Sequence, residues 1–497
     1  MPRRPTNVVF ILSDDPGCWA LGAAGNPEIR TPHLDRLARE GMRFENFFCT
    51  SPVCSPARAS LLTGRIPSQH GVHDWIRGGN SGAGRIEYLA GQRAYTDALA
   101  EAGYVCGLVG KWHLGASDVP QKGHSCWQVT PQGGGSYLDP KLVGPDGVVF
   151  TEKSYLTDLI TDRAVDFIGR ESDGRRPFCL GVNFTAPHSP HLDQHPREIV
   201  ESYDACAFAS CPQEPRHPWA EEFPIDMQFS RSLSSDPGRD WPAREYLKGY
   251  FAAVTAMDLG VGRILAALDE RGLREDTLVV FSSDNGFSCG LHGVWGKGNA
   301  TFPLNLYDTS VKVPAIFSQP GRIPVGRVSP ALVSGYDFAP TLLDWLGRPG
   351  ALPGELPGRS FLPVLEGREN AARDLVTVFD EYGPARMIRT AGWKYVHRYP
   401  YGPHELYDLG SDPEERRNLL SGGGSAAASS GASDCEETVR DLRARLEDWF
   451  AGHVDPRRDG VREPVAGRGQ DCLAGLASRG RRASHAREGD GYGGAKA

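Results

Sequence analysis

Short apolar runs alternate with longer stretches of helical pattern over the first two thirds of the chain. Residues 7–13 are almost wholly apolar and end at two aspartates, which is typical of a strand buried on both faces of a parallel sheet. Residues 32–40 follow with the pattern of a helix. The alternation of helix and buried strand then recurs in residues 95–102 and 104–109, 155–168 and 178–184, and 246–271 and 277–282. This order predicts an α/β fold built on a parallel sheet.

The pattern changes after residue 367, so we expect a principal domain over residues 1–367 and a smaller α+β domain over residues 368–452. Candidate strands spaced as in an antiparallel meander, and a helix after them, cover residues 375–379, 386–390, 393–398, 405–409 and 435–450. Residues 421–433 are almost all Gly, Ala and Ser, which predicts a flexible surface loop. Residues 453–497 are rich in Gly and Arg with few large apolar residues, which predicts a disordered tail.

The composition is that of an ordinary globular protein, with 40% apolar and 23% charged residues. A formal net charge of -8 over 497 residues is mild, so neither a nucleic acid nor an anionic membrane is indicated as a partner. The eleven cysteines show no C-x-x-C pair, which argues against a zinc ribbon and against a dense disulfide framework. The first apolar run is too short for a secretory signal, and no later stretch approaches the roughly 20 apolar residues of a membrane helix. A cytoplasmic location is the default expectation, and the oligomeric state stays open.

Polar side chains follow four of the predicted strands at their carboxyl ends; they are Asp14, Asp15, Lys111, His113, His188, Asp284 and Asn285. Open α/β sheets bind ligands beyond the carboxyl ends of their strands, so we expect these side chains to meet at one edge. Each has an ordinary explanation alone, because Asp is common in turns and caps and a single Lys or His is most often a satisfied polar group. Together, buried oxygen donors would repel one another unless a hard cation lay between them. Mixed carboxylate and amide ligands suit Ca²⁺ better than Mg²⁺.

Cys54 lies where a helix is expected to begin. Pro56 suits the first turn of a helix and residues 58–62 continue it, so Cys54 is expected at the N-terminus, where backbone amides and the helix dipole favour an anion. Arg58 lies one helical turn further on and can reach back to the same place. A lone cysteine is ordinarily a small buried hydrophobic residue, but these neighbours argue for a chemical role.

The run Cys54-Ser55-Pro56-Ala57-Arg58 resembles the C-x-P-x-R signature of the type I sulfatases, within the alkaline phosphatase superfamily. The chain also carries, in the order of that family, Asp14-Asp15, Gly110-Lys111-Trp112-His113-Leu114-Gly115, Ala186-Pro187-His188, Ser283-Asp284-Asn285-Gly286, Gly296-Lys297, Gly392-Trp393-Lys394-Tyr395 and Glu405-Leu406-Tyr407-Asp408-Leu409. The resemblance implies a large mixed, mostly parallel sheet flanked by helices, with a smaller C-terminal α+β subdomain. It covers the chain except for the tail.

In that family a maturation enzyme oxidises the cysteine of the signature to Cα-formylglycine, whose hydrate is the nucleophile for the hydrolysis of sulfate esters. The resemblance implies that the metal, expected to be Ca²⁺, is bound by Asp14, Asp15, Asp284, Asn285 and the formylglycine at Cys54. Asp284 would accept the proton of the attacking hydroxyl, and Arg58 would orient residue 54. Lys111 and Lys297 would hold the sulfate oxygens. His188 is the expected general acid toward the leaving group, and His113 the base that allows sulfate to leave residue 54.

Residues 123–157, with Trp127 and three consecutive glycines, form an insertion that resembles the loop region of sulfatases acting on sugar sulfates. A carbohydrate O-sulfate or N-sulfate is therefore favoured over a simple aryl sulfate, although loops vary freely on such a scaffold. Some residues near the motifs have structural explanations at least as good as a role in a substrate pocket; they are His70, His73, His191, Tyr203 and His292.

Two other functions stay open. A phosphonate monoester or phosphodiester hydrolase of the same superfamily can share the formylglycine and the metal ligands. A non-catalytic, metal-binding protein would keep the fold while Cys54 stays a thiol. The second is disfavoured because the chain retains Arg58 and the paired lysines and histidines together with the metal ligands.

Overall fold

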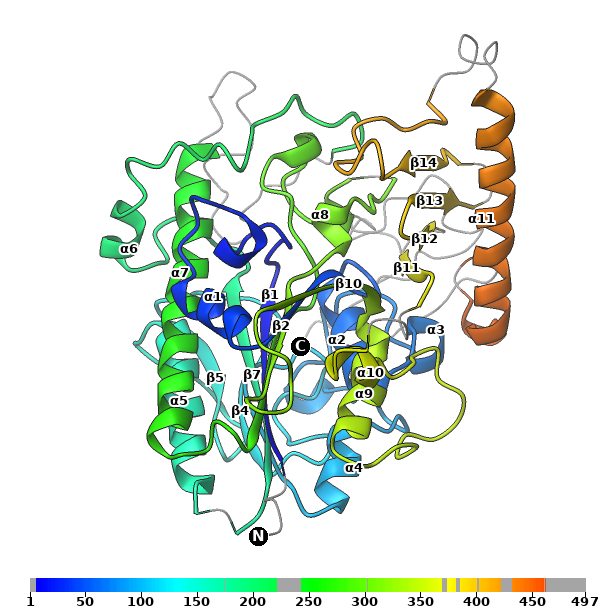
Figure 1. Cartoon of the computed structure of the whole chain (residues 1–497). Coiled ribbons are helices and arrows are strands. Elements are labelled where there is room, and N and C mark those ends of the chain that lie inside the picture. The colour runs from blue at the N-terminus through cyan, green and yellow to red at the C-terminus, as the bar shows by residue number, and fades with distance from the viewer. Residues whose placement is uncertain are drawn as a thin grey trace.

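The computed structural model describes residues 6–173, 175–220, 243–301, 303–368, 373–380, 385–399, 402–421, 431–459 and 461. The centre of this described part is an eight-stranded sheet in the order β10 (Arg327–Ser334), β2 (Met42–Phe48), β9 (Ala315–Ser318), β8 (Thr277–Ser283), β1 (Asn7–Asp14), β7 (Phe178–Pro187), β3 (Val105–Lys111) and β4 (Cys126–Thr130). Strand β9 runs antiparallel to both neighbours, and the other pairs are parallel. Strands β1, β2 and β7 are labelled near the centre of Figure 1. The predicted mixed, mostly parallel sheet is confirmed.

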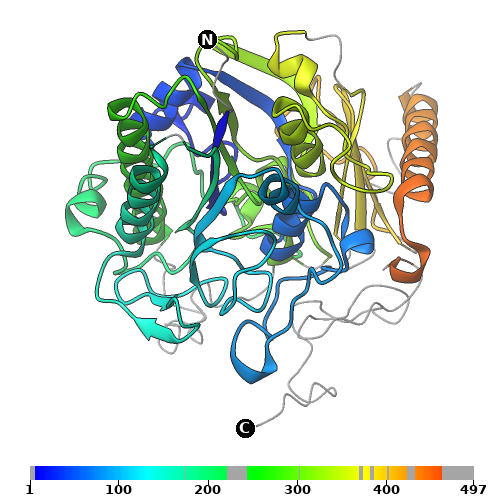
Figure 2. The same ribbon diagram turned by 90° about the horizontal axis from the view of Figure 1, so that it is seen from below.

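Helices cover both faces of this sheet, as Figure 2 shows. Residues of β1 alternate between two hydrophobic cores, because successive side chains of a strand point to opposite faces. Val9 belongs to the core that includes α5 and α7, whereas Phe10 stacks on Phe338 in the core of the other face. The helices of the first core are α1 (Pro32–Arg39), α5 (Leu156–Glu171) and α7 (Ala243–Glu270), and those of the second are α4 (Tyr95–Glu101) and α9 (Phe338–Trp345).

The helices and strands that the apolar pattern predicted in the principal domain are present, with their ends within three residues of the predicted positions. Further helices in the described chain are α2 (Cys54–Thr63), α3 (Pro67–His70), α6 (Arg197–Glu201), α8 (Asp308–Val311) and α10 (Leu362–Leu365).

The pattern missed one half of the sheet. Strand β2 has exposed and half-buried positions in its middle, and β10 begins with exposed residues and contains Pro330, so neither is a continuous apolar run. Strand β9 has only four residues, and β4 is half-buried at its start. The insertion after β4 holds a small hairpin of β5 (Lys141–Val143) and β6 (Val149–Thr151).

One sequence-based expectation is corrected by α7. This helix of 28 residues is long and apolar enough to cross a membrane by length and composition, although no such stretch was expected. Many of its residues are Ala and Gly, which spread its apolar character thinly along the chain. Most of the helix is buried against α5 and β7, as in the core helix of a folded domain.

The C-terminal part forms a second sheet in the order β11 (Val376–Asp380), β12 (Ala385–Arg389), β13 (Trp393–Arg398) and β14 (Glu405–Asp408). Its strands pair antiparallel, which confirms the predicted meander. Helix α11 (Gly431–His453) packs on this sheet, at the right-hand side of Figure 1. Ile388 and Tyr395 of the sheet share a core with Leu446 and Phe450 of the helix.

The ends of α11 differ from the expectation. Residues 431–433, predicted as part of a flexible loop, already belong to the helix, and residues 422–430 lie outside the described residues. Residues 453–459, predicted as the start of a disordered tail, are folded: a short 3₁₀ helix spans Pro456–Arg458, and Arg386 pairs with Asp459 at 2.5 Å. Beyond residue 461 the tail lies outside the described chain. The boundary at residue 367 stays a prediction.

Candidate active site

Four neighbouring strands end at one place. Strands β8, β1, β7 and β3 are adjacent in the sheet and parallel, so their carboxyl ends lie at the same edge. Asp14 and Lys111 are the last residues of β1 and β3, and His188 and Asp284 directly follow β7 and β8. The expected meeting of these residue types at one sheet edge is therefore what the structure shows.

Three carboxylates form the centre of this edge. Oxygens of Asp14, Asp15 and Asp284 lie within 4.8 Å of one another, and all three side chains are buried. Asp15 has a φ of 69°, in the left-handed region, which turns the chain as it leaves β1. The side-chain amide of Asn285 donates to Asp15 Oδ1 at 2.6 Å. The predicted acidic cluster is thus assembled from two segments that are 270 residues apart.

Each carboxylate has a cationic partner. Lys111 Nζ bonds Asp14 Oδ2, Arg58 Nε donates to Asp284 Oδ2 at 2.8 Å, and Lys297 Nζ donates to Asp15 Oδ1 at 2.6 Å. Burial opposes ionisation of Asp14, but Lys111 and His188 keep the pKa of that carboxyl below its usual range. The pKa of Asp15 is likewise lowered against the effect of burial, mainly by Lys297. Burial and the charge of Asp14 raise the pKa of Asp284.

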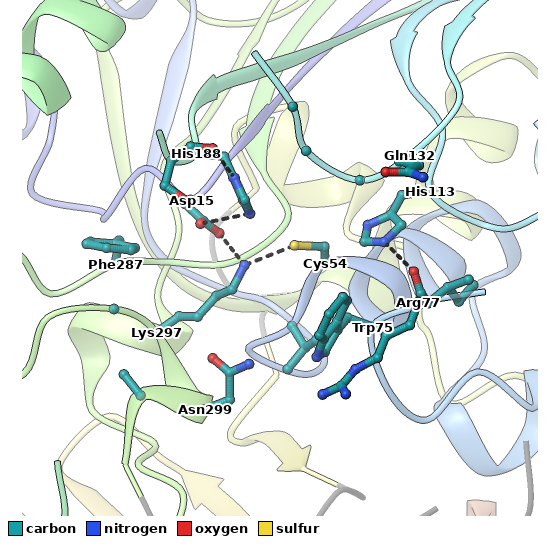
Figure 3. Close-up of a pocket in the computed structure, with 18 of the residues that line it drawn as sticks. Asp15, Cys54, Trp75, Arg77, His113, Gln132, His188, Phe287, Lys297 and Asn299 are labelled. Carbon is teal, nitrogen blue, oxygen red and sulfur yellow. Dashed lines mark hydrogen bonds and ion pairs between the residues drawn. The ribbon is translucent and has the colours of Figure 1, made fainter. Parts of the chain in front are cut away.

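Cys54 is the first residue of α2, as predicted, and its side chain contacts both an ammonium group and a carboxylate. Lys297 Nζ donates to Cys54 Sγ at 2.9 Å (Figure 3), and the thiol donates to Asp14 Oδ1 at 3.4 Å. Burial and the neighbouring Asp14 raise the pKa of the thiol to about 12. The unmodified thiol is therefore protonated at neutral pH and a weak nucleophile.

Arg58 and Lys111 lie behind the reacting group. Arg58 bridges Asp284 and the backbone carbonyl of Lys111, to which its Nη1 donates at 3.1 Å. The Lys111 side chain is fully buried on Asp14, and neither cation lines the pocket described below. Both therefore act on the carboxylates directly, and Arg58 has no hydrogen bond to the side chain of residue 54 in the described structure.

The two histidines present different nitrogens to the site. His113 Nε2 lies 3.1 Å from the Ile76 carbonyl oxygen, to which it donates, so the unprotonated Nδ1 is left as an acceptor. Burial, with Lys111 and Arg58 nearby, holds the pKa of His113 well below its usual value. His188 donates from Nδ1 to the Ser189 carbonyl at 2.7 Å, and its Nε2 lies 3.9 Å from Asp15 Oδ2.

These groups open into a pocket of about 530 Å³. Its wall contains Asp15, Cys54, His113, His188 and Lys297, so five of the predicted site residues face one cavity (Figure 3). The three consecutive glycines of the insertion, Gly133 to Gly135, also line it, whereas sequence reasoning missed other wall residues, which include Trp75, Arg77, Gln132, Phe287, Trp295 and Asn299. Few of these residues follow a predicted strand, so their position along the chain carried no signal.

Several side chains that had been considered for the pocket have structural contacts instead. His191 Nε2 donates to the Pro187 carbonyl at 2.8 Å and so supports the turn that carries His188. The Tyr203 hydroxyl accepts from the Arg30 amide at 3.0 Å, and His292 stacks on Tyr307 at 3.9 Å. His70 bonds Ser60 Oγ at 3.1 Å, and His73 is buried away from the pocket wall.

Comparison with known proteins identifies the family of the chain. Residues 6–348 match the sulfatase family model, and residues 300–443 match the model of the C-terminal region of N-sulphoglucosamine sulphohydrolase. These matches define the class of protein as a sulfuric ester hydrolase with the fold of the alkaline phosphatase superfamily. The chain belongs to the sulfatase family.

Curated relatives cover most of the chain. It is 29% identical over 485 residues to the N-acetylglucosamine-6-O-sulfatase of Bacteroides thetaiotaomicron, with 84% of this chain and 83% of that protein covered. It is 28% identical over 454 residues to the choline-sulfatase of Rhizobium meliloti, with 84% and 83% covered. A solved structure of a protein in complex with its substrate D-glucosamine-2-N,6-O-disulfate is similar with a TM-score of 0.75 and 25% identity, over 91% of this chain and 100% of that one.

Proposed function

We propose that this sulfatase removes a sulfate group from a saccharide, with residue 54 matured to formylglycine and Ca²⁺ bound beside it. The observation that carries the proposal is the arrangement around Cys54: three buried carboxylates within 4.8 Å of one another, Lys297 on Sγ, and two histidines on the wall of the same pocket.

The residues present fit a hard cation. Asp14, Asp15 and Asp284 offer carboxylate oxygens and Asn285 offers an amide oxygen, which are the ligand types of Ca²⁺. Buried carboxylates this close together repel one another, and a cation among them offsets that repulsion. When bound, the cation would supply stabilisation of the negative charge on the sulfate oxygens.

The chain's own side chains supply binding and proton transfer. As the hydrate of formylglycine, residue 54 would supply the attacking hydroxyl at the N-terminus of α2, beside Asp14 and Lys297, and Asp284 would accept the proton of that hydroxyl. Lys297 reaches the pocket and is placed to bind a sulfate oxygen. His188 holds its Nδ1 proton on Ser189, so its Nε2 is the atom that protonates the leaving oxygen or nitrogen as the bond to sulfur breaks. The free Nδ1 of His113 accepts a proton from residue 54 when sulfate is released.

The pocket wall suits a sugar ring. Trp75 and Trp295 offer apolar faces, while Arg77, Gln132 and Asn299 offer donors, a combination typical of pockets that bind small polar ligands. A volume of about 530 Å³ is enough for more than a sulfate group. The relatives support a saccharide substrate only in part, because one is named for an N-acetylglucosamine sulfate and another for choline sulfate.

The test compares substrates and identifies residue 54. Glucosamine 6-sulfate and glucosamine N-sulfate should be hydrolysed with a higher kcat/KM than choline sulfate or an aryl sulfate. A preference for choline or aryl sulfate would overturn the saccharide assignment, and a preference for phosphate analogues would overturn the reaction class.

Mass spectrometry of the peptide that contains residue 54 should show formylglycine, and a peptide that is wholly thiol in active protein from the native host would contradict the mechanism. Elemental analysis of active protein should find Ca²⁺, and finding Mg²⁺ instead would contradict the metal assignment.

A further inference from the structure

Lys394, in the Gly-Trp-Lys-Tyr motif, is fully buried although it lies in the C-terminal sheet, outside the pocket wall. A buried ammonium requires partners, and Lys394 Nζ bonds Asp308 Oδ1 at 2.9 Å and Glu415 Oε1. Glu415 in turn accepts from the backbone amide of Asp308, through Oε2 at 2.8 Å. Two residues of the C-terminal subdomain therefore hold Asp308, the first residue of α8, by its side chain and by its backbone.

Helix α8 lies between this clamp and the loop that follows β8, in the upper half of Figure 1. The Gly286 amide donates to the Ser310 carbonyl at 2.9 Å, and Ser288 Oγ bonds Thr309 Oγ1 at 2.8 Å. A Cβ on Gly286 would lie 2.2 Å from the Thr309 carbonyl oxygen, so the loop and the helix are in direct backbone contact. The segment directly after Asp284 and Asn285 thus rests on α8.

Asn305 connects α8 to Lys297. Ser310 Oγ donates to Asn305 Oδ1 at 2.7 Å, which orients the carboxamide so that its Nδ2 faces two backbone carbonyls. Nδ2 donates to the carbonyls of Lys297 at 3.1 Å and Gly298 at 3.2 Å. Asn305 is 1% exposed and does not line the pocket, so these contacts hold the turn that carries Lys297 from behind.

We propose that Asn305 is a positioning residue for Lys297, and that the C-terminal subdomain sets this position through Lys394, Glu415 and α8. The inference rests on the proposed function insofar as Lys297 binds the sulfate group. Lys297 Nζ must be placed within hydrogen-bond distance of both residue 54 and the substrate, and an ammonium on a four-carbon chain has many rotamers. The bonds from Nζ to Asp15 and Cys54 select among those rotamers, and the bond from Asn305 fixes the backbone position from which the side chain extends.

The test uses inorganic sulfate as the probe and a double-mutant cycle. Asn305→Asp keeps the shape but replaces the donor with an oxygen that repels both carbonyls, and Asn305→Ala removes the group. We expect each to lower kcat/KM by about 10- to 100-fold and to raise the inhibition constant of sulfate in parallel. In a Lys297→Ala background the same changes should have little further effect. Losses that multiply in the double variants would overturn the inference, because a residue with only a structural role acts independently of Lys297.

Two further variants keep the test decisive if Asn305 variants fold poorly. Ser310→Ala removes the hydroxyl that orients the carboxamide, and Glu415→Gln weakens the bond between residue 415 and Lys394; each should weaken sulfate inhibition by roughly 3- to 10-fold. Unchanged sulfate inhibition in Ser310→Ala overturns the Asn305 link, and in Glu415→Gln it overturns the role of the subdomain. Asn46→Ala, which removes a carboxamide bonded to the Pro330 carbonyl at 2.9 Å, is the matched control. If Lys297→Ala leaves sulfate inhibition unchanged, Lys297 does not bind the sulfate group. That result would contradict the proposed function of Lys297, and it is distinct from a failure of the coupling between Asn305 and Lys297.

Discussion

Gly133 lies directly over the ring of His113, and an added methyl group there should disable the enzyme. A Cβ at Gly133 would lie 2.2 Å from His113 Cε1 and 2.4 Å from both ring nitrogens, whereas ordinary contacts are 3.4–4 Å. The ring or the loop must therefore move by more than 1 Å. The φ of Gly133 lies outside the left-handed region, so alanine fits the backbone and the effect comes from the methyl group alone.

A displacement of this size at a catalytic group costs about 10²-fold in rate, so we expect Gly133→Ala to lower kcat/KM by that factor. The free energy of unfolding should fall by about 1–3 kcal/mol, as in an overpacked site, so the protein should still fold. Gly135→Ala is the matched control, because a Cβ there meets nothing within 4 Å, and it should retain kcat/KM within about twofold. Gly134→Ala, 3.2 Å from His188 Cε1, should lie between them. Steady-state kinetics on one sulfate ester and thermal unfolding of all three variants measure this, and equal kcat/KM for the 133 and 135 variants would refute the reasoning.

Three other predictions follow from described contacts. Cys54→Ala should abolish turnover and change the unfolding midpoint little, since the residue contributes one small buried side chain; retained activity would place the nucleophile elsewhere. Asp258 of α7 accepts hydrogen bonds from the backbone amides of His33 and Leu34 at the start of α1, at 3.1 and 2.7 Å. Asp258→Ala should therefore lower the free energy of unfolding by about 2–4 kcal/mol, and Asp258→Asn by about half as much. Urea titration measures this, and equal unfolding midpoints for wild type and variants would contradict it. Burial lowers the pKa of His124 to about 4, so the folded protein should lose stability as pH falls from about 6.5 toward 4, where only the unfolded chain takes up this proton. His124→Asn, which can keep the bond to the Gln121 carbonyl, should reduce that slope by up to about 1.4 kcal/mol per pH unit, and parallel curves for wild type and variant would exclude His124 as the cause.

Much of the site could be predicted from the sequence because its residues follow apolar strands. Asp14, Lys111, His188 and Asp284 each stand where a buried run ends, and parallel strands bring their carboxyl ends to one edge. The helix that begins at Cys54 was predicted from Pro56 and the residues after it. These signals are local, since each depends on residues within one or two turns or on the period of a strand.

The sequence by itself therefore determined the α/β class, the parallel half of the sheet, the antiparallel C-terminal meander and the chemical types at the sheet edge. Only the tertiary structure decided which charge meets which: that Lys111 pairs with Asp14 behind the pocket while Lys297 faces residue 54, that Gly133 covers His113, and that Lys394 supports α8. It also decided the positions of β2, β9 and β10, whose residues are neither continuously apolar nor regularly alternating. The physical reason is the separation along the chain of the residues that interact. Periodicity and capping act between neighbours in the chain, whereas ion pairs and close contacts join distant segments, such as Asp15 and Lys297, which are 282 residues apart, and their geometry exists only once the sheet and its helices have packed.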